Sequence, residues 1–581
     1  MSTEQIRAAR KAFDENEVCK VEKLLQNHEL YDVTIKKNHR SRPLKPFQSK
    51  AAVPLHELLS AWSDSKGDES VFRSAVIDLL DGSAGAITQL SEVVTAFRSL
   101  DRSRIGLLLV RRPEPSDSDW LLRLFERIGA GGVALTEPER LYSIYKHHEP
   151  FIHDVVTEIE CQIGQIMAPV DIAGTVLRIA NARTPNGGFG TPSVLVLAKE
   201  LKEVGENATF ASELHKLIPS ELTTEPSVQA GNRAQCLMTL AFKTLFDILR
   251  YDEHNKSGLP AAMLVELPRD LLQVLVYWIV LADPSEVQHR TTVPEIRAEM
   301  LRFGLFWRLC SLGDAPAGMQ CFKFLTNPAD RTNPADRSGF PGKELYQLLT
   351  GTLMIEDEGK EQLKYAIELV PPGCLEQYAP ISSTERWLDW NERFERDCKN
   401  PASRTLYKRW WESSRKTLIW VQRDYISNGF PNYDPSSGRD DDKPFELDHL
   451  QPYSFFNYPQ TEHSAYDNFL KNRYALRDSI GNLRWFDASE NSSWGNCNVL
   501  EKLDLRQQRA PNRWNVSGFN IKDCKTVQLW QDAALNKGNW SGANMKAFQQ
   551  AVEERTLWLY QQFWSDAAFG QWFPSPDVEV T

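Results

Sequence analysis

The chain has 581 residues, enough for three or four domains of about 150 residues each. Its 41% hydrophobic and 25% charged residues are ordinary for a globular protein, and a net charge of −11 argues against a general binder of polyanions. The nine cysteines form no C-x-x-C pair, which favours buried thiols in a reducing compartment over a disulfide framework or a zinc site.

The first elements along the chain include a well-marked helix start. Residues 125–136 read FERIGAGGVALT, and Thr136 is followed by Glu137, Pro138 and Glu139. A threonine cap, a proline in the first turn and early acidic residues predict that a helix begins here. We expect it to continue through Tyr145.

The central part, residues 151–400, is predicted to be mainly helical. Spacing of about 3.6 residues between apolar positions predicts helices over 154–167, 193–204 and 234–250. The apolar run 271–282 is shorter than the ~20 residues of a membrane span and contains a glutamine, so it predicts a buried helix. With no apolar segment at the opening residues, we expect a cytoplasmic protein with no membrane contact.

A long helix over residues 404–425 is expected next. It carries a basic cluster, Arg404, Lys408, Arg409, Arg415, Lys416 and Arg423, interleaved with Trp410, Trp411 and Trp420. The tryptophans fit a stripe facing the core at least as well as they fit base stacking. Phosphate contact is expected of some of the basic residues. A further helix is predicted over 544–564.

The stretch 444–498 carries the strongest chemical signal. It reads PFELDHLQPYSFF and, after a gap, DSIGNLRWFDASENSSWGNCN. This predicts two short extended segments followed by a helix capped near Asn491. A neutral imidazole such as that of His449 can deprotonate water near pH 7, and a hard divalent cation with oxygen ligands can neutralise a phosphate. Because neighbouring strand residues point to opposite faces, Asp448 and His449 can share one site only if the chain bends there.

This stretch resembles the HNH, or ββα-metal, nuclease fold. Its spacing is similar to the HNH domain of RNA-guided CRISPR nucleases, where a D-H-I-x-P-x-S segment precedes an I-x-N segment and a final Asn. The preceding residues 418–425 and 432–435 resemble the lead-in to the HNH domain of GmrSD-type, modification-dependent restriction enzymes. Residues 125–136 are similar to the F-x-R-I-N-x-G-G-x-x-L-[ST] segment of that family's N-terminal domain, with Gly129 in place of the Asn.

The resemblance implies a site in which His449 is the general base and Asn482 an orienting residue, both counted as catalytic. Asp448 and Asn491 would hold Mg²⁺ or Mn²⁺. Zn²⁺ is not expected to be the working metal, because no Cys/His ligand set is present. Residues 471–526 hold ten Lys/Arg against six Asp/Glu, and the DNA contacts expected here are Arg473, Arg477, Arg484, Lys502, Arg506 and Arg509.

The predicted fold is mainly α with a small α+β part. Four domains are expected: 1–150, a remnant of the ParB-like α/β N-terminal domain of GmrSD-type proteins; 151–400, helical; 401–530, the HNH nuclease; and 531–581, a helical extension. The family's D-G-Q-Q-R nucleotide motif is not found and no P-loop replaces it, so we expect no nucleoside triphosphate binding by this chain alone. A partner chain could carry that segment, and a homo-oligomer is also left open.

The predicted function is a metal-dependent HNH endonuclease that hydrolyses DNA, in restriction of foreign or modified phage DNA. Two alternatives remain open. One is a non-catalytic DNA-binding or regulatory subunit that keeps the fold as a scaffold. The other is cleavage of RNA, since phosphodiester chemistry alone does not select the sugar.

Overall fold

The structure is a computed structural model, and it describes residues 35–37, 40–42, 55–66, 68–79, 94, 136–164, 166–203, 208–218, 236–281, 293–326, 339–352, 364–376, 401–413, 415–431, 433, 435, 443–456, 474–499, 501–502, 530 and 540–573. Contacts divide the chain into two compact units, Met1–Ser118 and Asp119–Thr581. Most of the described residues are helical, with a small two-stranded sheet in each unit. The prediction of a mainly α chain with a small β part is therefore confirmed.

The first unit contains a short hairpin and a helix pair. Strands β1 (Ile35–Lys37) and β2 (Arg40–Arg42) pair antiparallel. Helices α3 (Leu55–Ser65) and α4 (Glu69–Leu79) pack together, with the rings of Trp62 and Phe72 edge to face at 4.9 Å. Residues 125–135, which carry the predicted ParB-like resemblance, lie outside the described part of the chain.

The second unit confirms the predicted helix start. Helix α7 (Glu137–His148) begins with Thr136 as its cap and a proline in the first turn. The backbone N–H of Thr136 donates to the Glu139 carboxylate at 2.7 Å, and the Thr136 side chain accepts from the Glu139 backbone. Two of the helix's unpaired N–H groups are satisfied in this way. Tyr145 is fully buried, as its helical spacing predicts.

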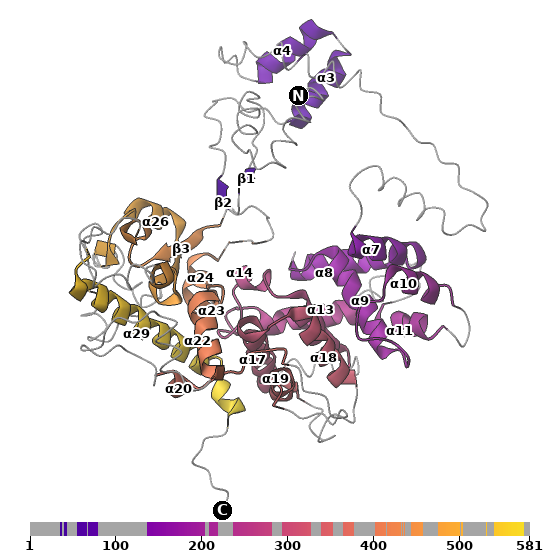
Figure 1. Cartoon of the computed structure of the whole chain (residues 1–581). Helices are drawn as coiled ribbons and strands as arrows, with labels where there is room; N and C mark the ends of the chain where they lie inside the picture. Colours follow the sequence, from indigo (N-terminus) through magenta and orange to yellow (C-terminus); the bar gives the residue numbers. More distant parts are fainter. Residues whose placement is uncertain are drawn as a thin grey trace, which may run out of the picture. The chain divides into compact units, whose positions relative to one another are not determined.

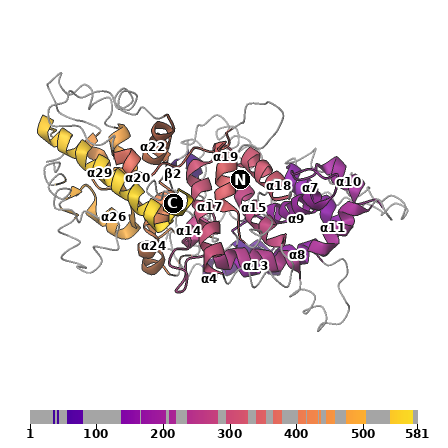
Figure 2. The ribbon, with the colours of Figure 1, turned by 90° about the horizontal axis from the view of Figure 1, so that it is seen from below.

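The central helices pack against one another around a buried apolar core (Figures 1 and 2). They are α8 (Ile152–Ile163), α9 (Pro169–Arg183), α10 (Val194–Glu200), α11 (Thr209–Leu217), α13 (Leu237–Leu249), α14 (Ala261–Leu264), α15 (Arg269–Val280), α17 (Pro294–Cys310), α18 (Asp314–Thr326), α19 (Gly342–Thr350) and α20 (Pro372–Glu376). The three helices predicted from spacing are present as α8, α10 and α13. Every residue of α15 from Asp270 to Val280 is buried, as the apolar run predicts.

Helix α8 ends earlier than expected, because Gly164 adopts φ 72° and stops the helix. Within the described residues, no helix combines the length and apolar character that a bilayer crossing requires.

The prediction of one long helix over residues 404–425 is wrong. The segment forms α22 (Pro401–Ser413), α23 (Thr417–Val421) and α24 (Arg423–Gly429). Gln422 lies at the break between the last two, with φ −98° and ψ 18°. Its side chain accepts from the Trp485 N–H at 2.7 Å and donates to the Trp485 carbonyl at 3.1 Å. The helix is therefore interrupted at Gln422, whose side chain forms hydrogen bonds with the backbone of Trp485 in a strand distant in sequence.

The tryptophans of this segment belong to the core. Trp410, Trp411 and Trp420 are each at most 1% exposed. The core-stripe interpretation is the one that the structure bears out, and base stacking by these three rings is excluded in this conformation.

Helix α29 (Gly542–Asp566) confirms the predicted C-terminal helix. It packs against the segment 480–482 and against α20 and α23, and it is followed by η11 (Phe569–Trp572). Arg302 of α17 donates to the Ala567 carbonyl at 2.8 Å at the end of α29. Since Asp119–Thr581 forms one contact unit, the domain boundaries at 150, 400 and 530 stay a prediction.

Candidate active site

The expected hairpin-and-helix layout is present in the C-terminal part. Strand β3 (Phe445–His449) pairs antiparallel with β4 (Leu483–Asp487), with Asp448 opposite Arg484 and His449 opposite Leu483. Helix α26 (Ala488–Trp494) follows β4 directly and packs on both strands. The ββα order predicted for residues 444–498 is therefore observed as local structure.

The short helix η9 (Ile480–Asn482) is locked before β4 by the Asn482 side chain. This fully buried amide accepts from the Gln451 N–H at 2.9 Å and donates to the carbonyls of Gln451, at 3.3 Å, and Arg477, at 2.9 Å. Asn482 therefore ties the loop that follows His449 to the segment that carries Asp478. The orienting role expected of Asn482 stays a prediction, and these hydrogen bonds are made to the backbone and not to the imidazole.

Helix α29 supports the same loop from the other side. The buried guanidinium of Arg555 donates to the carbonyls of Ile480, Gly481 and Leu483 at 2.8–3.1 Å. A Cβ on Gly481 would lie 2.2 Å from the Val552 carbonyl oxygen, so only glycine allows this approach. Burial lowers the pKa of Arg555 to about 9.

His449 is held by an acid that the sequence did not single out. Its Nε2 lies 3.1 Å from Oδ1 of Asp478, and both side chains are partly exposed. Arg477 donates to both carboxylate oxygens of Asp478, at 2.8 and 2.5 Å. Burial raises the pKa of Asp478, but hydrogen bonds from His449 and Arg477 and the charge of Arg477 outweigh it and hold that pKa well below its usual value. Asp478 is therefore ionised at neutral pH.

Asp448 lies in a buried ion cluster. Its side chain is only 4% exposed. Arg484 Nε donates to Oδ2 at 2.8 Å, and Lys502 Nζ donates to Oδ1 at 2.7 Å. Burial raises the pKa of Asp448, but the two cations outweigh it and lower the pKa, so the carboxylate is ionised.

Arg484 and Lys502, two of the residues expected to contact DNA, belong to this ion cluster, and the expectation is corrected for both. Arg484 is fully buried and Lys502 is 1% exposed. Both side chains neutralise Asp448, and Lys502 also donates to the His449 carbonyl at 2.5 Å. In this structure they stabilise the hairpin and do not present charge to a nucleic acid.

Asp448 and His449 are not brought into one site. The strand does not bend at this point, because the N–H of Leu450 continues the ladder by donating to the Asn482 carbonyl at 2.8 Å. Regular alternation then places the two side chains on opposite faces of β3. Asp448 shares a face with Arg484, and His449 faces Asp478.

Asn491 also differs from its expected setting. It lies within α26 and does not cap it, since the cap is Asp487, whose side chain accepts from the Glu490 N–H at 2.8 Å. The Asn491 amide donates to the Glu446 carboxylate at 2.7 Å, two residues before Asp448 on β3. Asp448 and Asn491 therefore have different partners and do not form the expected ligand pair.

The predicted metal site does not fit this arrangement. Each oxygen of Asp448 already accepts from a buried cation, and a divalent ion would add positive charge to that cluster. In the described ranges, no group of three or more His, Cys, Asp or Glu side chains is placed to hold a metal.

The remaining DNA-binding predictions divide between described and undescribed residues. Arg473, Arg506 and Arg509 lie outside the described part of the chain. Arg477 is 8% exposed and engaged by Asp478. Arg415, from the upstream basic cluster, is exposed and donates to the Asp478 carbonyl at 3.3 Å, so a cation stands beside the His449–Asp478 pair.

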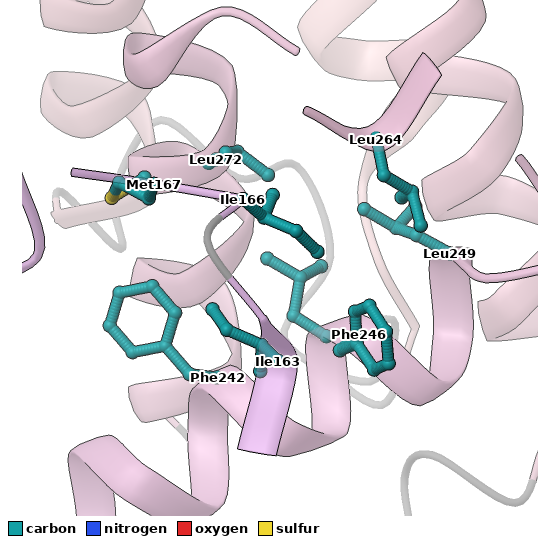
Figure 3. Close-up of a pocket in the computed structure, with 9 residues that line it drawn as sticks. Ile163, Ile166, Met167, Phe242, Phe246, Leu249, Leu264 and Leu272 are labelled. Atoms are coloured by element: carbon teal, nitrogen blue, oxygen red, sulfur yellow. The ribbon is translucent and has the colours of Figure 1, made fainter. Parts of the chain in front are cut away.

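A separate apolar pocket lies among the central helices (Figure 3). Nine apolar side chains line it: Ile163, Ile166, Met167, Phe242, Leu245, Phe246, Leu249, Leu264 and Leu272. It offers no acid, base or nucleophile, so this pocket is not a candidate for a hydrolytic site.

In comparisons with known proteins, no family model and no curated protein matches this chain.

Proposed function

We propose that this chain is a phosphodiester hydrolase acting on nucleic acid, with His449 as the general base. The observation that carries the proposal is the 3.1 Å contact between His449 Nε2 and the ionised Asp478, on a ββα hairpin with exposed Arg415 beside it. The resemblance to the HNH domain of GmrSD-type enzymes supports an endonuclease acting on DNA, in restriction of foreign or modified phage DNA.

The hydrogen bond defines which nitrogen of His449 is basic. An ionised carboxylate can only accept a hydrogen bond, so Nε2 is the donor and carries the hydrogen, and Nδ1 of the neutral ring keeps its lone pair. Nδ1 would take a proton from water as the water oxygen bonds to phosphorus, and the bond from phosphorus to the 3′ oxygen would break. Asp478 stabilises the imidazolium that forms, and solvent supplies the proton for the departing oxygen. Arg415 would contact the phosphate.

Dependence on Mg²⁺ or Mn²⁺ is proposed from the resemblance alone. Because Asp448 is occupied by Arg484 and Lys502, no step of this chemistry is assigned to a metal. The dependence is a separate measurement, made by comparing each ion with EDTA.

One observation favours a second function. An acid at the Asp448 position that is neutralised by two buried cations suits a scaffold better than a metal-dependent enzyme. The alternative is therefore a non-catalytic nucleic-acid-binding or regulatory subunit, which would bind nucleic acid without cutting it.

The deciding experiment incubates the pure chain with supercoiled plasmid, glucosylated phage DNA and RNA, each with Mg²⁺, Mn²⁺ or EDTA. His449→Ala is expected to lose about 10²–10⁴-fold in cleavage rate, the usual contribution of a positioned base. The matched control is His215→Ala, because His215 Nε2 also contacts a carboxylate, Glu149, at 2.8 Å, and neither residue belongs to the ββα segment.

The control variant should cut like wild type. Cutting of RNA alone would select the RNA-cleaving alternative. Binding without cutting of any substrate would select the scaffold. Equal cutting by wild type and His449→Ala would refute the proposed base.

A further inference from the structure

Two tyrosine rings are exposed beside the His449–Asp478 pair. Tyr453 is 42% exposed and Tyr474 is 44% exposed. Among the large apolar side chains that the described residues leave exposed, these two are the aromatic ones; the others are Val71, Leu195, Val196, Leu281, Leu312 and Met319. The rings at the candidate site thus differ from those of Trp410, Trp411 and Trp420, which are buried.

The two rings are organised around one guanidinium. Arg477 lies over the ring of Tyr453 at 3.9 Å and over the ring of Tyr474 at 4.8 Å. Tyr453 also contacts the imidazole of His449, with ring centroids 5.8 Å apart. Arg477 is itself fixed by Asp478. The network that holds the base of the proposed reaction therefore also holds both tyrosines.

This arrangement suits nucleobases. An exposed aromatic ring loses little on stacking and gains about 1–3 kcal/mol for each base, as alanine substitutions show in single-strand-binding proteins. With the cation in place, 42% of Tyr453 and 44% of Tyr474 remain exposed. Exposed Arg415, which contacts the Asp478 backbone, supplies a positive charge for the phosphate between bases.

We propose that Tyr453 and Tyr474 form a stacking platform for unpaired bases, so that this chain engages single-stranded segments. The bases of an intact duplex already stack on one another and cannot offer their faces. The platform would place the strand so that a phosphate beside the stacked bases reaches His449. That last step rests on the proposed function, whereas binding by the platform does not.

Binding is measured with fluorescein-labelled oligo(dT) of 20 nucleotides and with a labelled duplex of mixed sequence. The full-length His449→Ala chain is used in EDTA, so that cleavage cannot interfere. Tyr453→Ala and Tyr474→Ala are each expected to weaken oligo(dT) binding by about 5- to 150-fold. Tyr453→Phe and Tyr474→Phe keep the ring and should bind like the parent. The duplex should bind more weakly than oligo(dT) and respond less to the alanine changes.

Several outcomes would overturn the platform. One is that both alanine variants bind oligo(dT) as tightly as the parent, and another is that the phenylalanine variants lose as much affinity as the alanine variants. The platform is also overturned if the duplex binds more tightly than oligo(dT), or if the alanine variants lose binding to a protein partner but keep oligo(dT) binding. If the alanine variants unfold, Tyr→Leu variants with native circular dichroism take their place and should show the same loss. If the chain cuts no substrate but removal of the rings weakens oligo(dT) binding, the platform is supported and the nuclease proposal is rejected. If the chain cuts nucleic acid but removal of the rings leaves oligo(dT) binding unchanged, the nuclease proposal stands and the platform is rejected.

Discussion

Arg484 Nε lies 2.8 Å from Oδ2 of Asp448, directly across the β3–β4 hairpin. Lys502 occupies the other oxygen at 2.7 Å. A charge buried in this way loses its hydration, and only the opposite charges beside it make burial tolerable. The carboxylate that the motif marks as a metal ligand therefore serves as the counter-ion of two buried cations.

Asp448→Asn should consequently act on stability. Removing one partner of a buried ion cluster leaves uncompensated charge and costs about 3–5 kcal/mol of unfolding free energy. The control is Asp171→Asn, because Asp171 forms a surface ion pair with Arg269 at 3.3 Å, and such pairs contribute about 0–1 kcal/mol. Urea denaturation measures both. An equal, small change in the two variants would show that the cluster contributes nothing special.

The same cluster predicts a pH dependence. The folded pKa of Asp448 lies below its ordinary value of 3.8. A depressed pKa contributes stability that is fully present above the unfolded value and is lost as pH falls through the folded one. The stability difference between wild type and Asp448→Asn should be constant from pH 7 to about 5 and shrink below about 4. A difference that stays constant down to pH 2 would mean that folding does not lower the pKa of Asp448.

Local features were predictable from sequence, whereas partners distant along the chain were not. The Thr136–Glu139 capping box and the buried helix α15 follow from residues within one or two turns. The hairpin and its helix follow from the local sequence pattern around Asp448 and Asn482. The partners of Asp448 lie 36 and 54 residues away, and nothing in a local pattern distinguishes a lysine that reaches phosphate from one that neutralises a buried acid.

The same limit explains Asp478. It precedes the I-G-N segment by two residues and follows an arginine, which locally is typical of a solvated ion pair. Its contact with His449 arises only when β3 and the 474–482 segment are packed together. The break at Gln422 is a second example, because its partner Trp485 lies 63 residues away.

Asp478→Asn tests the positioning of His449. Asparagine keeps a hydrogen-bonding group but loses the charge that favours the Nε2–H form and the imidazolium. We expect cleavage to fall roughly 10–100-fold, the usual effect of losing a side chain that orients a functional histidine. A wild-type cleavage rate in this variant would remove Asp478 from the site.

Asn482→Ala tests the loop lock. The variant leaves buried backbone groups of Gln451 and Arg477 without their partner, which costs about 1–3 kcal/mol. Asn255→Ala is the control, because Asn255 also ties two carbonyls, of Ile248 and Arg250, at 2.8 and 2.9 Å and lies outside the ββα segment. Both variants should lose stability in urea denaturation, and only Asn482→Ala should lose cleavage per folded molecule. Parallel losses of cleavage would mean that the effect is general destabilisation.

The last prediction concerns the contact between the candidate site and α29. A Cβ on Gly481 would meet the Val552 carbonyl oxygen at 2.2 Å and Thr556 Oγ1 at 2.4 Å, so the helix must move away. Gly481→Ala is therefore expected to destabilise the chain by about 1–3 kcal/mol, the range of overpacked cores. Gly174, inside α9, has nothing within 4 Å of its added Cβ, and Gly174→Ala should stabilise by up to about 1 kcal/mol through helix propensity. Thermal unfolding of the two variants should thus shift in opposite directions. If Gly481→Ala unfolds at the wild-type temperature, α29 does not pack closely against the loop that carries Asn482. The support that Arg555 of α29 gives to this loop would then also be rejected.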